Sequence, residues 1–155
     1  MTVYLVRHVV ARSRGHWDGD DELRPPTVKG ERQATGLAEQ LRDAPIRRLL
    51  SSPALRCVES LAPLAKKLGL RIEKTDALQE GAPIDQAYDL LNKVARKKGD
   101  TVLCAHGDLI PGLVDAVARD GAKTDPPQWA KGSTWKLDWD GHHFTSARYV
   151  PPQSG

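Results

Sequence analysis

The hydrophobic pattern of the chain alternates between short continuous apolar runs and longer stretches with apolar residues three and four apart. The short runs have the length and the branched residues of buried strands, and they cover residues 2–6, 46–51, 70–75 and 101–105. The longer stretches have the helical period, and they cover residues 27–41, 52–68, 84–97 and a segment that begins near Asp108. The pattern therefore predicts strands that alternate with helices.

Local signals place several ends of these elements. Thr27 is expected to cap the first helix, and Ser52 the second, with Pro53 at its first position, where a missing N–H costs nothing. Gly69 follows two lysines and ends that helix. Near the C-terminus, residues 133–150 have the pattern of a hairpin around the turn dipeptide Asp140-Gly141.

The order of these elements predicts the fold class. Strand–helix alternation is typical of an α/β fold, here a three-layer α/β/α sandwich with a mainly parallel central sheet and an antiparallel C-terminal edge hairpin. We expect a single domain over residues 1–150 and a frayed tail over 151–155. Two stretches, 9–26 and 120–131, are expected to be loops, and loops of that length are usually functional or mobile.

Composition narrows the class of protein. The chain of 155 residues has two cysteines, Cys57 and Cys104, which indicate small core residues rather than a disulfide framework. A leader or membrane-spanning stretch is not expected, and the predicted location is cytoplasmic. The net charge of +3 is scattered and falls partly at helix ends, so neither nucleic acid nor a membrane is expected as a partner. The sequence does not indicate an oligomeric state.

Basic and titratable residues follow three of the predicted strands. Arg7 and His8 end the first strand, Arg56 follows the second, and His106 follows the run 101–105. Because ligands of parallel α/β sheets bind outside the carboxyl ends of the strands, we expect these side chains to meet at one rim. Paired arginines suit a phosphate dianion, and a neutral imidazole can attack phosphorus. The pattern predicts a phosphate site with a nucleophilic histidine.

The motifs around these residues resemble those of the histidine phosphatase superfamily, also called phosphoglycerate mutase-like. The resemblance covers residues 1 to about 118, in the family's order, and its motifs are specific. The family's "RHG", "LTxxGxxQA", "SSPxxRxxxT" and "HG" correspond here to Arg7-His8-Val9, "PTVKGERQA", "SSPALRCVES" and His106-Gly107.

The resemblance implies a role for each matching residue. His8 would be the phosphorylated nucleophile, Arg7, Arg56 and His106 would bind the phosphate, and Gly107 would lie beside it. Glu80 is the expected proton donor, with Asp21 and Glu22 as rivals. Among the arginines of the first loop, we expect Arg24 to reach the remote end of the substrate. The ligand spacing of a metal site is absent from "DGDDE" at residues 18–22, so no metal and no other cofactor is expected.

The short gap between Arg56 and His106 leaves little room for the insertions of sugar-phosphate mutases, so a mutase is disfavoured. The chain is most similar to the small SixA-type branch, and parts of it also resemble the phosphatase half of bacterial Nudix–phosphatase fusions. The expected activity is therefore metal-independent hydrolysis of a phosphomonoester or of protein phosphohistidine, and the resemblance to the SixA type makes protein phosphohistidine the leading expected substrate. A phosphatase for nucleotide-derived small molecules is an alternative.

Val9 departs from the family pattern, which has glycine or alanine after the nucleophile. A β-branched residue does not easily adopt a positive φ, and it could narrow the phosphate pocket. A second hypothesis follows from this departure: a weakly active or inactive module that binds phosphate or a phosphorylated ligand.

Overall fold

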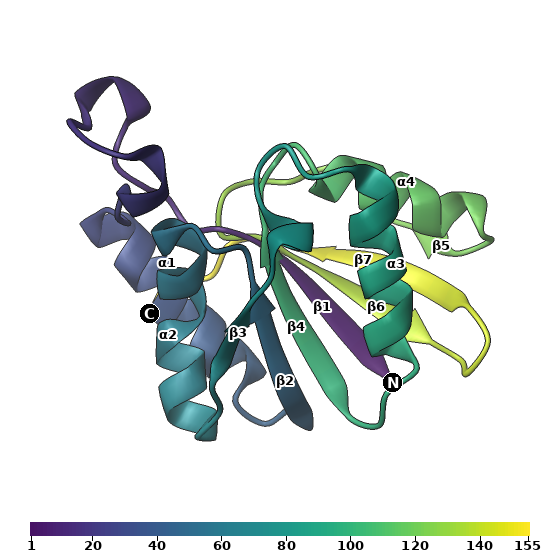
Figure 1. The fold of residues 1–155 in the computed structure, drawn as a ribbon. Helices are drawn as coiled ribbons and strands as arrows, with labels where there is room; N and C mark the ends of the chain where they lie inside the picture. The colour runs from purple at the N-terminus through teal and green to yellow at the C-terminus, as the bar shows by residue number, and fades with distance from the viewer.

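The structure, a computed structural model, describes residues 1–155 and has one seven-stranded sheet as its middle layer (Figure 1). The strands lie in the order β3-β2-β4-β1-β6-β7-β5. Their bounds are β1 (Thr2–Arg7), β2 (Ile46–Ser51), β3 (Ile72–Lys74), β4 (Asp100–Ala105), β5 (Lys123–Thr124), β6 (Thr134–Trp139) and β7 (Phe144–Val150). Strand β1 pairs in parallel with β4 and antiparallel with β6, so the predicted mixed sheet is confirmed.

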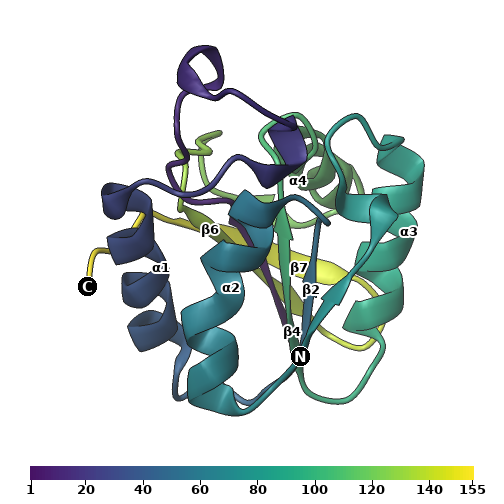
Figure 2. The same cartoon turned by 60° about the vertical axis from the view of Figure 1, so that its left-hand side comes forward.

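Four α-helices cover the two faces of the sheet: α1 (Val28–Leu41), α2 (Leu55–Leu68), α3 (Ile84–Ala95) and α4 (Ile110–Arg119). Helices α1 and α2 lie together on one face, and α3 and α4 lie on the other (Figures 1 and 2). This is the three-layer arrangement that the alternating pattern predicts. None of the four helices combines the length and the apolar character that crossing a membrane requires.

Each face of the sheet has its own hydrophobic core, because successive strand residues point to opposite faces. In β1, Tyr4 and Val6 pack on the side of α1 and α2, whereas Val3 and Leu5 pack on the side of α3 and α4. Trp135, from β6, is fully buried in the second core. The two cores make the strand ends of β1, β2 and β4 a rigid base for the site described below.

The helix ends are partly as predicted. The Thr27 hydroxyl accepts a hydrogen bond from the Gly30 amide (3.1 Å) and caps α1. Ser52 does not cap α2, which begins at Leu55; its hydroxyl accepts a bond from the Ala54 amide (3.3 Å) in a short turn before the helix. Pro53 therefore lies outside the helix. The predicted start of the helix was wrong because the Ser52 hydroxyl is hydrogen-bonded to the His106 ring instead.

Other boundaries differ by a few residues. The predicted strand over 70–75 shrinks to β3, and the helix over 84–97 ends at Ala95. Helix α4 begins at Ile110 rather than at Asp108. The second predicted loop contains β5, two residues that pair in parallel with β7 and have no hydrophobic pattern to reveal them. Strand β5, and not the hairpin, is consequently the outermost strand on that side.

The hairpin and the tail are held by specific contacts. The carboxylate of Asp140 accepts hydrogen bonds from the amides of His142 and His143, which closes the predicted turn. The tail does not fray: the Gly155 amide donates to the Arg32 carbonyl (2.9 Å) of α1. The backbone of Gln153 lies so close to Gly36 that a Cβ there would be 2.6 Å from the Gln153 carbonyl carbon. The absence of a side chain at Gly36 therefore leaves room for the backbone of the tail to pack against α1.

Candidate active site

The topology brings three strand ends to one place. Strand β4 lies between β1 and β2, with Ala105 paired to Arg7 and Cys104 paired to Ser51. His8 follows β1 and His106 follows β4, so their rings lie side by side, with centroids 5.4 Å apart. Arg56 reaches the same rim from the first turn of α2. The expected convergence of these residues is what the structure shows.

His8 is held as a neutral imidazole with one free nitrogen. Its Nδ1 lies 2.8 Å from the carbonyl of Val9, and because a carbonyl only accepts, Nδ1 carries the proton. Nε2 makes no hydrogen bond within the protein, and the residue lines the main cavity of the site. Burial lowers the pKa of His8 to about 3, and the nearby positive charges of Arg56 and Arg7 add to this effect. The free lone pair on Nε2 is therefore available at neutral pH.

His106 is oriented by a serine. Its Nε2 lies 2.8 Å from the Ser52 hydroxyl. Since that hydroxyl already accepts from the Ala54 amide, it can donate its proton to Nε2. This arrangement puts the ring proton of His106 on Nδ1, which is buried, has no hydrogen-bond partner and lies 3.8 Å from a carboxylate oxygen of Glu80. His106 thus presents an unused N–H to the site.

The two arginines also present unused donors. Arg56 is almost fully buried, and the Nε atoms of both Arg7 and Arg56 have no hydrogen-bond partner. Arg7 donates to the carbonyl of Trp129 (2.7 Å) and passes directly over Gly107, where a Cβ would lie 2.7 Å from the guanidinium carbon. Buried donors without partners cost free energy unless a ligand accepts from them. Unused donors of this kind suit a compact anion.

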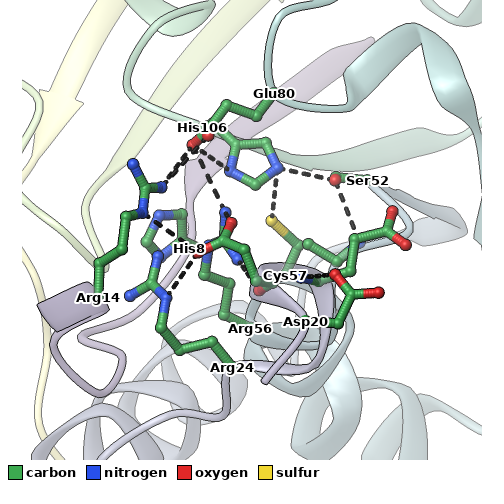
Figure 3. A network of polar contacts seen from close by, with 12 residues as sticks. His8, Arg14, Asp20, Arg24, Ser52, Arg56, Cys57, Glu80 and His106 are labelled. Atoms are coloured by element: carbon green, nitrogen blue, oxygen red, sulfur yellow. Dashed lines mark hydrogen bonds and ion pairs between the residues drawn. The ribbon is translucent and has the colours of Figure 1, made fainter. Parts of the chain in front are cut away.

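The carboxylates of Glu80 and Asp21 both form ion pairs with Arg56, and Figure 3 shows Glu80 beside Arg56. Glu80 lies 3.5 Å from Arg56 and also pairs with Arg14 (3.2 Å), and its carboxylate points toward the His106 ring. Asp21 accepts from Arg56 (3.2 Å) through its side chain, and its backbone carbonyl accepts from the same guanidinium (2.9 Å). Burial raises the pKa of Asp21, but the hydrogen bond from Arg24 and the charges of Arg56 and Arg14 prevail and lower it.

The two carboxylates differ in their position relative to His8. Glu80 lines both the main cavity, which contains His8, and a smaller neighbouring cavity of about 220 Å³, which contains Arg56 and His106. Asp21 and Glu22 line only the smaller cavity. Of the three candidate acids, Glu80 is therefore the one that borders the nucleophile.

Arg24 is buried and borders the main cavity, but its guanidinium is already engaged. It donates to the Asp21 carboxylate (3.0 Å) and to the carbonyl of Arg12 (2.6 Å). Its contacts tie the two ends of the 9–26 loop together. These contacts give Arg24 a role in shaping the loop, and its contact with the remote end of a substrate stays a prediction.

Val9 does not enter the cavity. It is fully buried, and its Cγ2 would lie 3.1 Å from a Cβ built on Gly30, so its side chain faces α1. No residue other than glycine has a positive φ, so the chain after His8 does not need glycine. The Val9 amide donates to the Ser60 hydroxyl (2.9 Å). The concern that valine obstructs the pocket has no basis in this geometry.

Three contributors to the site were not predicted from the sequence. Ser60 holds the backbone of Val9 and donates to the carbonyl of Arg56 (2.5 Å), which links β1 to α2. Cys57, expected only as core, lies 3.5 Å from His106 Nε2. Lys131 borders the cavity from the loop before β6. Ser60 could have been found from the sequence, because it is a polar residue on the apolar face of α2. No comparable pattern marks Lys131.

The chain matches the family model described as "Histidine phosphatase superfamily (branch 1)" over residues 3–83. It is 34% identical over 161 residues to an 8-oxo-(d)GTP phosphatase of Mycolicibacterium smegmatis; the match covers 97% of this chain and 48% of that protein. The chain thus spans about half the length of that relative.

Solved structures share the fold at low sequence identity. A protein histidine phosphatase SixA complexed with tungstate is 20% identical, with a TM-score of 0.78, and the match covers 99% of this chain and 97% of that one. A mycobacterial glucosyl-3-phosphoglycerate phosphatase is 15% identical, with a TM-score of 0.70, and the match covers 99% of both chains. At these identities the likeness establishes the fold.

Proposed function

The chain belongs to the histidine phosphatase superfamily, and we propose that it is a metal-independent phosphatase that works through a covalent phosphohistidine on His8. The observation that carries the proposal is the state of His8, a buried neutral imidazole whose Nδ1 proton is held by a carbonyl and whose Nε2 is free. Beside it are three buried donors without partners, on Arg7, Arg56 and His106. These groups are suited to neutralising and orienting the equatorial oxygens of a phosphoryl group.

The proposed reaction has two displacements at phosphorus. His8 Nε2 attacks, a P–N bond forms, and the bond from phosphorus to the leaving oxygen breaks. The carboxyl group of Glu80 is the proposed source of the proton that this oxygen takes up. Water then attacks the phosphohistidine, the Glu80 carboxylate takes a proton from the water, the P–N bond breaks, and inorganic phosphate leaves. Arg7, Arg56 and His106 hold the phosphoryl oxygens through both steps.

We propose small phosphorylated molecules, including nucleotide-derived ones, as the leading substrates. The curated relative is named for an 8-oxo-(d)GTP phosphatase activity, which supports this choice. Protein phosphohistidine, named for the SixA neighbour, is the second candidate. The hypothesis of a binding module without turnover rested on Val9, which faces α1 rather than the cavity, so it has lost its supporting observation.

Trapping the intermediate tests the mechanism. Brief incubation with a radiolabelled phosphoester, followed by quenching in alkali, should leave label on His8 that is stable in alkali and lost in acid. The His8→Ala variant should lose turnover and labelling but still bind inorganic phosphate through the two arginines. Label on a serine or a carboxylate, or full activity in His8→Ala, would overturn the proposal.

A matched pair of variants tests the acid. Glu80→Gln and Asp21→Asn both remove a carboxylate that contacts Arg56. We expect Glu80→Gln to lower kcat about 10²- to 10⁴-fold for an alkyl phosphate, whose leaving group needs a proton, and much less for p-nitrophenyl phosphate. Asp21→Asn should affect both substrates alike. A leaving-group-dependent loss in Asp21→Asn instead would reassign the acid to Asp21.

A further inference from the structure

The cavity that contains His8 is larger than a phosphoryl group requires. Its volume is about 500 Å³, within the range of small-molecule sites. A water molecule takes about 30 Å³ of the liquid, so a five-atom phosphoryl group fills less than about a third of this space. Ser13, Arg14 and Lys131 also line this cavity. The cavity can therefore hold a substituent of the substrate beyond the phosphoryl group.

The backbone around Lys131 is fixed against the nucleophile strand. Its carbonyl accepts a hydrogen bond from the Gln33 side chain (3.2 Å). The next amide, that of Gly132, donates to the carbonyls of both Arg7 (3.1 Å) and His8 (3.0 Å). Gly132 has a φ of 85°, which favours glycine, and a Cβ there would lie 2.9 Å from the Gln33 amide group. Lys131 is thus attached to a segment that is positioned relative to His8.

The charge of Lys131 is uncompensated. No carboxylate oxygen lies within 4.0 Å of its ammonium group or of the Arg7 guanidinium, whereas Arg14, Arg24 and Arg56 all have carboxylate partners. Burial lowers the pKa of Lys131, and the charges of Arg7, Arg24, Arg14 and Arg56 lower it further. The cations around the cavity repel one another, and an added anion would relieve that repulsion.

The phosphoryl group accounts for only part of this charge. Unused donors on Arg7, Arg56 and His106 are available to the phosphoryl group. Lys131 lines the cavity that contains His8, whereas Arg56 and His106 line the smaller neighbouring cavity. We propose that Lys131 binds a second anionic group of the substrate, and that the substrates are small molecules with a second phosphate or carboxylate a few bonds from the scissile phosphoryl group. This inference rests on the proposed phosphatase function and names its substrate class.

Substrate pairs with and without the second anion test this inference. Guanosine 5′-diphosphate represents the phosphate arm, 3-phosphoglycerate the carboxylate arm, and p-nitrophenyl phosphate has no second anion. The quantity to measure is a ratio: kcat/KM for each substrate with a second anionic group, divided by kcat/KM for p-nitrophenyl phosphate. A ratio within one variant cancels losses of folded or active protein, and comparing the ratio between variants cancels differences in leaving group.

In Lys131→Gln, we expect the ratio for at least one arm to fall about ten- to a hundredfold, the effect of losing one contact to a charged group. Lys131→Arg should keep the ratio within a few-fold. Lys67→Gln, which removes a charge from the opposite end of α2, should leave both kcat/KM values unchanged. The arm that responds identifies the second group as phosphate or carboxylate.

Several results would overturn the inference while leaving the phosphatase proposal intact. The first is that the ratios do not change in Lys131→Gln. The second is that the protein hydrolyses p-nitrophenyl phosphate but neither guanosine 5′-diphosphate nor 3-phosphoglycerate. The third is that the protein prefers a phosphohistidine peptide and Lys131→Gln does not alter this preference. Failure of the phosphatase proposal has a different signature: His8→Ala would then hydrolyse all substrates as the unmodified chain does.

Discussion

At the scale of single residues, the state of His8 connects the site to the stability of the chain. The folded protein keeps the imidazole neutral, because burial and nearby positive charges lower its pKa to about 3. In the unfolded chain the same group has its ordinary pKa of about 6.5. Below about pH 6.5 the unfolded state therefore binds a proton that the folded state does not, and the free energy of unfolding falls as the pH falls.

This linkage predicts the acid sensitivity of the fold. Between pH 7 and pH 5, His8 alone should lower the free energy of unfolding by about 2 kcal/mol. Urea unfolding of the unmodified chain and of His8→Asn at both pH values isolates the effect, because the variant lacks the imidazole. We expect the loss to be about 2 kcal/mol smaller in His8→Asn. Equal losses in the two proteins would mean that His8 titrates normally when folded.

Val9 gives a second prediction at this scale. Its side chain is fully buried against α1 and does not line the cavity. Val9→Ala should cost about 1.5–3 kcal/mol of stability through lost burial and the void that remains. It should change kcat by less than a few-fold, since the His8 ring and its carbonyl partner stay in place. Urea unfolding and steady-state kinetics measure the two effects, and a many-fold rise in kcat would show that valine does obstruct the site.

At the scale of elements, the sequence was informative where an element has its own periodic pattern. Helix α1 was predicted with its cap, because the capping hydrogen bond of Thr27 is made with Gly30 of its own helix. The start of α2 was misplaced because Ser52 is bound by His106, a partner 54 positions away. Strand β5 was missed because two exposed residues have no pattern, and only pairing with β7 defines them.

The tail on α1 yields a prediction that separates helix propensity from packing. In a chain that ends at Val150, Gly36→Ala should stabilise the protein by up to about 1 kcal/mol, since alanine favours a helix. In the full chain a Cβ at position 36 meets the Gln153 backbone at 2.6 Å, so the gain should vanish or reverse. Unfolding free energies of the four proteins complete the cycle. If Gly36→Ala raised the free energy of unfolding equally in the full chain and in the shortened chain, the tail would not pack against position 36.

At the scale of the whole molecule, topology explains which part of the site could be predicted. Arg7, His8, Arg56 and His106 follow strands that a parallel sheet necessarily brings together, so their convergence could be expected from their order. Lys131 reaches the site only because β6 pairs antiparallel with β1 and its preceding loop bonds to Arg7 and His8. No local pattern in "QWAKGS" encodes that pairing, so the residue was not predicted.

The same topology predicts how the molecule unfolds. The core under α1 and α2 and the core under α3 and α4 are built on opposite faces of the same strands, since β1 and β4 contribute residues to both. Loss of either core would expose one face of those strands, so the two should unfold in a single transition. Each core has its own reporter: Trp135 and Trp139 are buried in the second, and the thiols of Cys57 and Cys104 are buried in the first. In a urea titration, tryptophan fluorescence and thiol accessibility to a disulfide reagent should give the same midpoint, and far-ultraviolet circular dichroism should agree with both. Exposure of the thiols at a lower urea concentration than the fluorescence change would mean that the face under α1 and α2, which also holds Arg56, opens on its own.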